Sequence, residues 1–302
     1  MIMISKFDKL KKYQQAFSLI ELSIVILIIG ILIAGVTQSS RLLRQMALSS
    51  ARSLTISSPI PSISGLVSWY EPTLDKSFDE FEASDNSTVT KWYDINPTSS
   101  SKIDLIQTDA ARRPTYASNA VNGLPSLKFN GVNTYLQTNG FSPEQNNSSF
   151  TFFAVTQNAT GSLSTHKAIF CNRYGYGSFM SGWVIYSYNN QYLLFWGTGG
   201  PMWIDILAQS IVNAKTDILT ITYDRINVVI YKNGANPVTQ ALGFVANNIR
   251  PTSVGSNSGC DGADNFFFNG YISEIILYNR NLKTDERQDV EKYLAKKWAI
   301  KI

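Results

Sequence analysis

The chain has 302 residues, enough for a membrane anchor and one sizeable globular domain. Charged residues make up only 16% of the chain, below the usual quarter, which is typical of exported β-rich proteins. Much of the net charge of +4 lies at the N-terminus, where Lys6, Lys9, Lys11 and Lys12 are opposed only by Asp8. Because nucleic-acid-binding proteins concentrate basic residues on their binding surface, this distribution argues against a nucleic-acid partner.

The segment 17–36, FSLIELSIVILIIGILIAGV, is apolar apart from one charged residue. Its 20 residues would form a helix about 30 Å long, enough to cross a bilayer. An ionised carboxylate at Glu21 is costly in hydrocarbon without a neutralising partner, so its presence requires a functional reason. We expect residues 17–55 to form a transmembrane and stalk helix, and residues 56–65, which contain two prolines, to form a linker.

The start of this helix resembles the N-terminal segment of type IV pilins and pseudopilins. The shared features are a short basic leader at 1–16, a junction between Ala16 and Phe17, and Glu21 in an unbroken apolar run. The resemblance implies that prepilin peptidase cleaves after Ala16 and that Phe17 becomes the N-methylated first residue. It also implies that Glu21, fifth from that end, meets the N-terminal amine of a neighbouring subunit during assembly. The family usually has glycine before the cut, where this chain has alanine. An ordinary signal anchor and a secretory signal peptide cut near Ala34 are the alternatives.

From Leu66 onward, short apolar runs alternate with clusters of Gly, Asn, Ser and Pro, which predicts an all-β antiparallel sandwich. Asn233 and Gly234 predict a hairpin turn, and the run 271–278, apolar on both faces, predicts a central strand. Thr284 is expected to cap a short C-terminal helix. The apolar stripe of this helix comprises Val290, Tyr293, Leu294 and Trp298.

Four pieces of the region 66–302 resemble the concanavalin A-like lectin/glucanase superfamily, in particular its LamG-like jelly rolls. They are LVSWYEP at 66–72, RPTYASNAVNGLPSLKFNGVNTYL at 113–136, ITYDRINVVIYKNG at 221–234 and FNGYISEIILYNRNLKTDERQDVEKYLAKKW at 268–298. The resemblance implies a jelly roll of two antiparallel sheets with a binding surface on its concave face or rim.

Some members of this superfamily cleave glycans, a reaction that requires two closely placed carboxylates. The superfamily's hydrolase signature, Glu-x-Asp followed closely by Glu, is absent from the sequence. The nearest acidic cluster, DEFE at 79–82, lies in a polar segment that is expected to form a loop. The one histidine, His166, is predicted to be a solvated surface residue. We therefore expect a protein that is not an enzyme and has no cofactor.

Cys171 and Cys260 lack the CxxC spacing of zinc and redox motifs. They either form one disulfide that closes a long loop or remain two buried free thiols. Asp261 and Asp264 could offer oxygen atoms to Ca²⁺, but their loop matches no calcium motif. We interpret them as solvated turn residues and expect no metal site.

Sugar-binding sites use the flat faces of aromatic side chains, and aromatic residues are dense in the region 171–203. Tyr174, Tyr176 and Trp203 lie among glycines and are predicted to be exposed ligand contacts. Alternation along strands sends about half of such residues inward. Trp183 and Trp196 are predicted to be in the core.

These observations predict a minor pilin-like subunit, at the tip or accessory, that assembles through its N-terminal helix and displays a lectin-like head. The stalk is short for a bulk filament subunit. Its partners would be prepilin peptidase, other pilin or pseudopilin subunits, the inner membrane, and a glycan or surface-protein ligand. It would cross the bacterial inner membrane once, with a periplasmic C-terminal domain that reaches the cell surface in an assembled pilus. The alternatives are a pseudopilin of a type II secretion-like system and a membrane-tethered glycan-cleaving enzyme.

Overall fold

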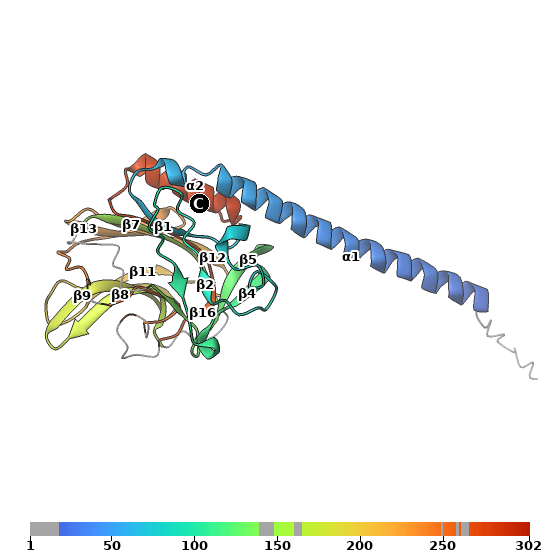
Figure 1. Ribbon diagram of the computed structural model, residues 1–302, viewed down its shortest axis with the longest axis horizontal. Helices are drawn as coiled ribbons and strands as arrows, with labels where there is room; N and C mark the ends of the chain where they lie inside the picture. The colour runs from blue at the N-terminus through green and yellow to red at the C-terminus, as the bar shows by residue number, and fades with distance from the viewer. Residues whose placement is uncertain (1–17, 139–147, 160–164, 249, 258–259, 261–265) are drawn as a thin grey trace, which may run out of the picture. The chain divides into compact units, whose positions relative to one another are not determined.

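The computed structural model describes residues 18–138, 148–159, 165–248, 250–257, 260 and 266–302. The chain divides into two compact units, Met1–Met46 and Ala47–Ile302, and the second is called the head below. Helix α1 (Leu19–Ile56), preceded by Ser18, provides the described part of the first unit and the first residues of the head (Figure 1). Within the part of the chain that the structure describes, no helix has the length and apolar character required to cross a membrane.

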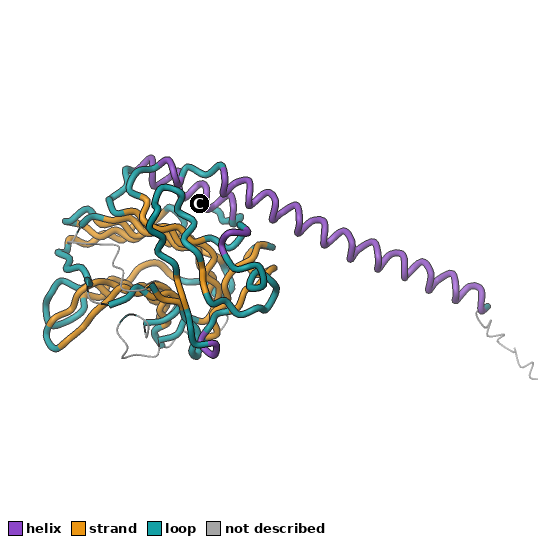
Figure 2. Tube along the Cα trace, in the orientation of Figure 1, coloured by secondary structure: helices purple, strands orange, loops and turns teal. Residues whose placement is uncertain are grey.

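The head is built from two eight-stranded sheets, A and B, in which the paired strands are antiparallel (Figure 2). Sheet A has the order β14-β13-β12-β7-β16-β5-β4, and β1 also pairs with β16. Sheet B has the order β11-β10-β9-β8-β15-β6-β3-β2. The predicted antiparallel sandwich is thereby confirmed.

The strands of sheet A are β1 (Leu66–Tyr70), β4 (Thr115–Val121), β5 (Leu124–Asn130), β7 (Phe150–Asn158), β12 (Thr216–Tyr223), β13 (Asn227–Lys232), β14 (Ala235–Ala241) and β16 (Asn269–Tyr278). Those of sheet B are β2 (Lys91–Trp92), β3 (Leu105–Ile106), β6 (Leu136–Gln137), β8 (Lys167–Tyr176), β9 (Phe179–Tyr188), β10 (Gln191–Trp196), β11 (Ile204–Ser210) and β15 (Ser253–Val254). The remaining elements are the helix α2 (Thr284–Lys297) and short 3-10 helices at Ile60–Ser62, Asp75–Ser77 and Ala110–Arg112.

The main core lies between the two sheets and is rich in aromatic side chains. Phe150 of β7 stacks on Trp183 of β9 and on Trp196 of β10, with ring centroids 5.6 and 6.0 Å apart. Both tryptophans are fully buried, as predicted. Rings of this size bury a large apolar area, so these contacts hold the two sheets together.

A second core fills the space between α2 and the opposite face of sheet A. Successive residues of a strand point to opposite faces. Phe152 of β7 therefore enters the main core, whereas its neighbour Phe153 packs toward α2. The predicted apolar stripe of α2 is buried in this second core. Sheet A is consequently covered on both sides, which explains why β16 is apolar on both faces.

Two local predictions have different outcomes. Asn233 and Gly234, with φ of 51° and 70°, form the tight turn between β13 and β14, which confirms the predicted hairpin. Thr284, in contrast, is the first residue of α2 and not its cap. The cap position belongs to Lys283, whose backbone N–H donates to the Glu286 carboxylate at 2.9 Å.

A fully buried charge cluster lies under α2. The ammonium group of Lys297 is 2.7 Å from the Glu71 carboxylate and 3.0 Å from that of Glu274, and none of these three side chains is exposed. The indole N–H groups of Trp69 and Trp298 donate to Glu274 at 2.8 and 2.7 Å. The cluster therefore joins β1, β16 and the C-terminal end of α2 through hydrogen-bonded charges.

Glu71 receives further donors, the backbone N–H groups of Thr73 at 2.9 Å and Leu74 at 2.7 Å. Burial by itself would raise the pKa of Glu71. The charge and hydrogen bond of Lys297, with the hydrogen bonds from Thr73, outweigh that effect and lower the pKa below its ordinary value. Glu71 is thus held as a carboxylate in the interior.

Candidate functional site

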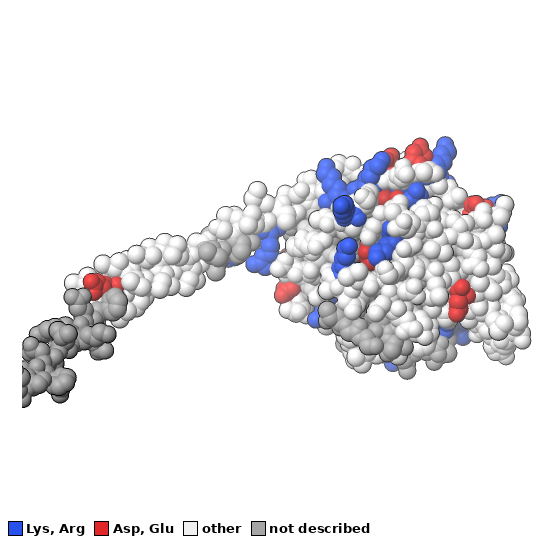
Figure 3. All heavy atoms as spheres, turned by 180° about the vertical axis from the view of Figure 1, so that it is seen from behind, with Lys and Arg blue, Asp and Glu red and all other residues white. Residues whose placement is uncertain are grey.

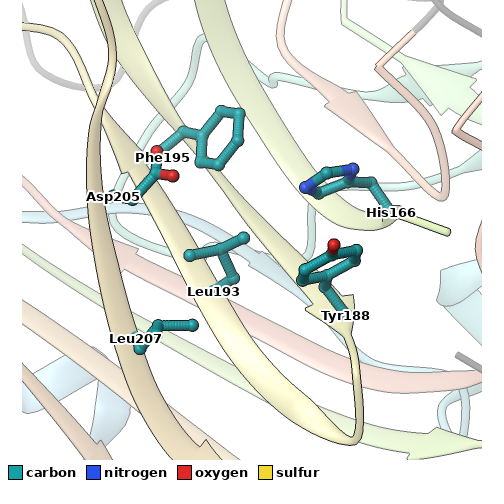
Figure 4. Close-up of a pocket in the computed structure, with 6 residues that line it drawn as sticks. All are labelled: His166, Tyr188, Leu193, Phe195, Asp205 and Leu207. Carbon is teal, nitrogen blue, oxygen red and sulfur yellow. The ribbon is translucent and has the colours of Figure 1, made fainter. Parts of the chain in front are cut away.

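A pocket of about 430 Å³ opens on the outer face of sheet B, the face turned away from sheet A (Figure 4). This volume lies within the range of small-molecule sites. The pocket is lined by side chains from β9, β10 and β11 and from the residue before β8. They are His166, Tyr188, Leu193, Phe195, Asp205 and Leu207.

Strand alternation places these side chains on the same face. Because Trp196 enters the main core, Leu193 and Phe195 of the same strand point outward. The antiparallel register of β10 and β11 then sets Leu193 opposite Leu207 and Phe195 opposite Asp205. Two adjacent cross-strand pairs therefore form the floor of the pocket. One pair joins two leucines, and the other joins a phenylalanine to an aspartate.

The imidazole of His166 forms an aromatic wall of the pocket. It stacks face to face on Tyr188, with ring centroids 4.2 Å apart and planes 4° apart. Its edge or tilted contacts with Tyr186, Phe195 and Phe266 have centroid distances of 5.1, 5.4 and 5.1 Å. The prediction of a solvated surface histidine is therefore wrong, because the ring is partly buried among four aromatic side chains.

Asp205 provides the carboxylate of the pocket and lies on the exposed edge strand β11. Partial burial raises the pKa of Asp205, and the charge of His166 acts in the opposite direction. No hydrogen-bond donor among the described residues contributes to this pKa. Asp205 lines the pocket, so its carboxylate is accessible to a ligand there.

Sequence reasoning missed Phe195 and Asp205. A usable signal was present, since placing Trp196 in the core fixes the outward face of β10. Alternation alone cannot predict that Asp205 lies beside Phe195, because that pairing depends on the register of β10 with β11.

The three aromatic residues predicted as ligand contacts do not lie together. Trp203 adjoins the pocket, stacked on Phe195 with centroids 6.4 Å apart, and the Arg173 guanidinium is 5.5 Å from its ring. Because neighbouring residues of β8 alternate between faces, Tyr174 and Tyr176 point away from the face that carries Arg173 and Trp203. Tyr176 is 76% exposed. Of the three, Trp203 alone contacts a residue of the pocket lining, and none of them is itself part of the described lining.

Cys171 and Cys260 form a disulfide, with Cα atoms 6.1 Å apart. Both cysteines are buried in a small apolar cluster on the outer face of sheet B, together with Tyr186 and Leu193. The bond ties Cys260 to β8, the strand that follows the pocket residue His166. Of the two alternatives for these cysteines, the structure contains the bonded form.

The other predicted site residues lie outside the pocket. Those outside the described residues are Ala16, Phe17, Asp261 and Asp264. The carboxylate of Glu21 accepts a hydrogen bond from the backbone N–H of Ser18 at 2.9 Å, at the start of α1. Across the described ranges, no group of three or more His, Cys, Asp or Glu side chains is arranged to hold a metal ion.

The acidic cluster 79–82 has local structural contacts. Asp79 accepts a hydrogen bond from the Tyr93 hydroxyl at 2.9 Å, and Glu82 accepts one from the backbone N–H of Thr90 at 2.9 Å. These bonds order the loop that precedes β2. The cluster does not line the pocket on sheet B.

Charges on the head are mixed in sign on the face that Figure 3 shows. Lys and Arg side chains there lie among Asp and Glu side chains, and much of the remaining surface is uncharged. Among the described residues drawn in that view, no continuous basic surface forms, in contrast to the usual footprint of a nucleic-acid-binding protein.

Comparison with known sequences supports the assignment of the N-terminal segment. Residues 11–37 match the family model for the prokaryotic N-terminal methylation motif. The match includes the predicted junction and Glu21, and it confirms the resemblance to a prepilin-type N-terminal segment. No characterised protein matches the sequence of the chain at a significant level.

Comparison with solved structures concerns the head. The binding domain of Paraclostridial Mosquitocidal Protein 1 is similar with a TM-score of 0.52 and 15% identity, over 77% of this chain and 52% of that one. Trypanosoma rangeli sialidase bound to sialic acid is similar with a TM-score of 0.50 and 15% identity, over 78% of this chain and 33% of the sialidase. A mutant of that sialidase displaying trans-sialidase activity is similar with a TM-score of 0.51 and 16% identity, over 86% of this chain and 39% of the mutant. This chain thus spans between a third and about half of those chains. At these identities the similarity shows a shared β-sandwich fold.

Proposed function

We propose that this chain is a minor type IV pilin-like subunit that assembles through its N-terminal helix and presents a carbohydrate-binding head. The methylation motif at 11–37 supports the first part of the proposal. In this scheme prepilin peptidase cuts between Ala16 and Phe17, and residues 17–36 hold the subunit in the inner membrane before assembly. The head is then periplasmic and reaches the cell surface with the filament.

Glu21 is the assembly residue in this scheme. Its carboxylate accepts the backbone N–H of Ser18, which shows that it can turn back toward the beginning of the helix. The same orientation would allow it to accept a hydrogen bond from the N-terminal amine of a neighbouring subunit. Such a pairing would compensate the cost of an ionised carboxylate in an apolar environment.

The pocket on sheet B is the observation that carries the second part of the proposal. Tyr188 and Phe195 provide aromatic surfaces against which the C–H face of a sugar ring can pack. Asp205 provides acceptors for sugar hydroxyl groups. An apolar floor with one polar, partly exposed carboxylate is the arrangement expected for a small polar ligand with apolar faces.

We propose a binding role and not a catalytic one. Asp205 is the one carboxylate among the described residues that line the pocket, whereas glycoside hydrolysis generally uses a pair of carboxyl groups about 5 to 10 Å apart. The acidic cluster 79–82, which could have supplied a second group, is engaged in local hydrogen bonds.

A glycan array probed with the detergent-solubilised full chain tests the binding role. The wild-type chain should bind at least one class of glycan, and Tyr188→Leu should weaken that binding by about tenfold because it removes an aromatic face. Asp289→Asn, an exposed change on α2, is the control and should bind like the wild type. Absence of binding to every glycan, or release of free sugar from a bound glycan, would contradict the proposal.

A pilus-incorporation assay tests the assembly role. Glu21→Ala should leave the subunit in the membrane and reduce its amount in sheared filaments by about tenfold or more, because the carboxylate that pairs with the neighbouring amine is gone. Glu21→Asp, which keeps the charge, should still enter filaments, in a smaller amount than the wild type. Normal incorporation of the alanine variant would exclude this role.

A further inference from the structure

The pocket combines a carboxylate with several aromatic faces, which is an arrangement suited to a cation. Asp205 lies opposite Phe195 across β10 and β11, and Tyr188 with the stacked His166 forms the adjoining wall. The carboxylate attracts positive charge, and the face of an aromatic ring attracts a cation within about 6 Å. Figure 4 shows these side chains around the same opening.

The side chains of Lys167 and Arg173, both on β8, have other partners. The Lys167 ammonium group lies 3.4 Å from the carbonyl oxygen of Gly131, away from the pocket lining. The Arg173 guanidinium lies 5.5 Å from the ring of Trp203, which stacks on Phe195. Neither lines the pocket, so among the described residues of the lining the imidazole of His166 is the one basic group near Asp205. An acidic ligand would therefore meet the Asp205 carboxylate, and the one basic group it could pair with among the described lining residues is the imidazole that stacks on Tyr188.

We infer that the pocket selects a sugar that carries a free amino group, such as a hexosamine unit, over neutral and acidic sugars. This inference rests on the proposed carbohydrate-binding function. The ammonium group forms a charged hydrogen bond with Asp205 and lies against the rings of Tyr188 and Phe195. The C–H face of the pyranose packs on the apolar floor made by Leu193 and Leu207.

Four oligosaccharides that share a β-1,4-linked glucan backbone provide a matched test. They carry, in turn, a free amine (glucosamine), an acetylated amine (N-acetylglucosamine), a hydroxyl (glucose) and a carboxylate (glucuronate). Affinities for the full chain in detergent micelles are measured by isothermal titration calorimetry at a pH at which the amine is protonated. The glucosamine oligomer should bind about tenfold or more tightly than the glucose oligomer, and the glucuronate oligomer should bind most weakly.

Variants assign this preference to the pocket. Asp205→Asn should remove the preference for the amine while retaining weak binding of the neutral sugar. Tyr188→Phe should keep the preference, whereas Tyr188→Leu should reduce it. Asp289→Asn, an exposed carboxylate on α2, should leave all four affinities unchanged. Far-ultraviolet circular dichroism confirms that each variant is folded.

The outcomes separate this inference from the function on which it rests. Tighter binding of the neutral or acidic oligomer, or an amine preference that survives Asp205→Asn, overturns the inference and leaves a carbohydrate-binding head. Tighter binding of any array glycan that lacks an amine, compared with the glucosamine oligomer, also overturns the inference and leaves a carbohydrate-binding head. Failure to bind any of these sugars, or any glycan on the array, overturns both. Binding of a lysine-rich peptide without any binding of the amino sugar also overturns the inference, because the pocket would then recognise the positive charge without the sugar.

Discussion

Replacing Lys297 with methionine tests the buried charge cluster of the head most directly. The change keeps most of the aliphatic stem and removes the ammonium group that lies 2.7 Å from Glu71 and 3.0 Å from Glu274. Two fully buried carboxylates then lose their common cation. Breaking a buried pair in this way typically costs 3 to 5 kcal/mol, so we expect the free energy of unfolding to fall by about that amount.

The pH dependence gives a second signature of the same change. In the wild type the pKa of Glu71 is lowered, so its contribution to stability is present above the unfolded-state pKa of about 4.3 and is lost as the pH falls. Without Lys297, burial is less strongly opposed and raises the pKa of Glu71. The folded state then favours the protonated acid. The difference in stability between variant and wild type should therefore be largest near pH 7 and shrink toward pH 4.

Urea unfolding of the detergent-solubilised chain, followed by tryptophan fluorescence between pH 4 and pH 7, measures both effects. Lys292→Met is the matched control on the same helix, because Lys292 is 65% exposed and pairs only with the exposed Asp289 among the described residues. An exposed pair of this kind contributes less than about 0.5 kcal/mol. A loss below about 1 kcal/mol for Lys297→Met, or an unchanged difference across the pH range, would refute the account of the cluster.

Two further predictions concern the disulfide and one ion pair. Replacing Cys171 and Cys260 together with alanine should lower the free energy of unfolding by about 2 to 4 kcal/mol, because the bond closes a loop with a sequence separation of 89. Equal urea midpoints for oxidised wild type and the double variant would exclude this contribution. The hydrogen bond from Arg280 lowers the pKa of Glu286 to about 2, so Glu286→Gln should destabilise the head at pH 7 by up to about 1 kcal/mol. That difference should disappear as the pH falls from about 4.5 to about 2, and a constant difference across that interval in thermal melts would count against it.

Local sequence patterns predicted the main features of the fold because these features depend on residues that are neighbours in the chain. The alternation of apolar residues predicted an antiparallel sandwich, and it placed Trp183 and Trp196 in its core. Asn233 and Gly234 predicted their turn because both adopt positive φ at low cost. The N-terminal segment was recognised from a contiguous motif, which a family model confirms over 11–37.

The candidate site could not be predicted in the same way, because its residues meet only through strand register. His166 was expected in solvent since its sequence neighbours, Thr165 and Lys167, are polar. Its actual contacts are Tyr188 and the more distant Phe266. The sequence also contains no sign of which charges become buried, as the ion pair between Lys297 and Glu71 shows.

The sequence by itself therefore determined the prepilin-type N-terminal segment, the sandwich class of the head and the burial of Trp183 and Trp196 in its core. Each of these follows from periodicity or from a contiguous motif, and both are properties of adjacent residues. Tertiary structure alone decided that Asp205 lies beside Phe195, that His166 stacks on Tyr188, and that the outer face of sheet B carries a pocket. The physical reason is that strand register and sheet order bring together side chains that are far apart in the chain, and a shift of one residue would turn them to the other face.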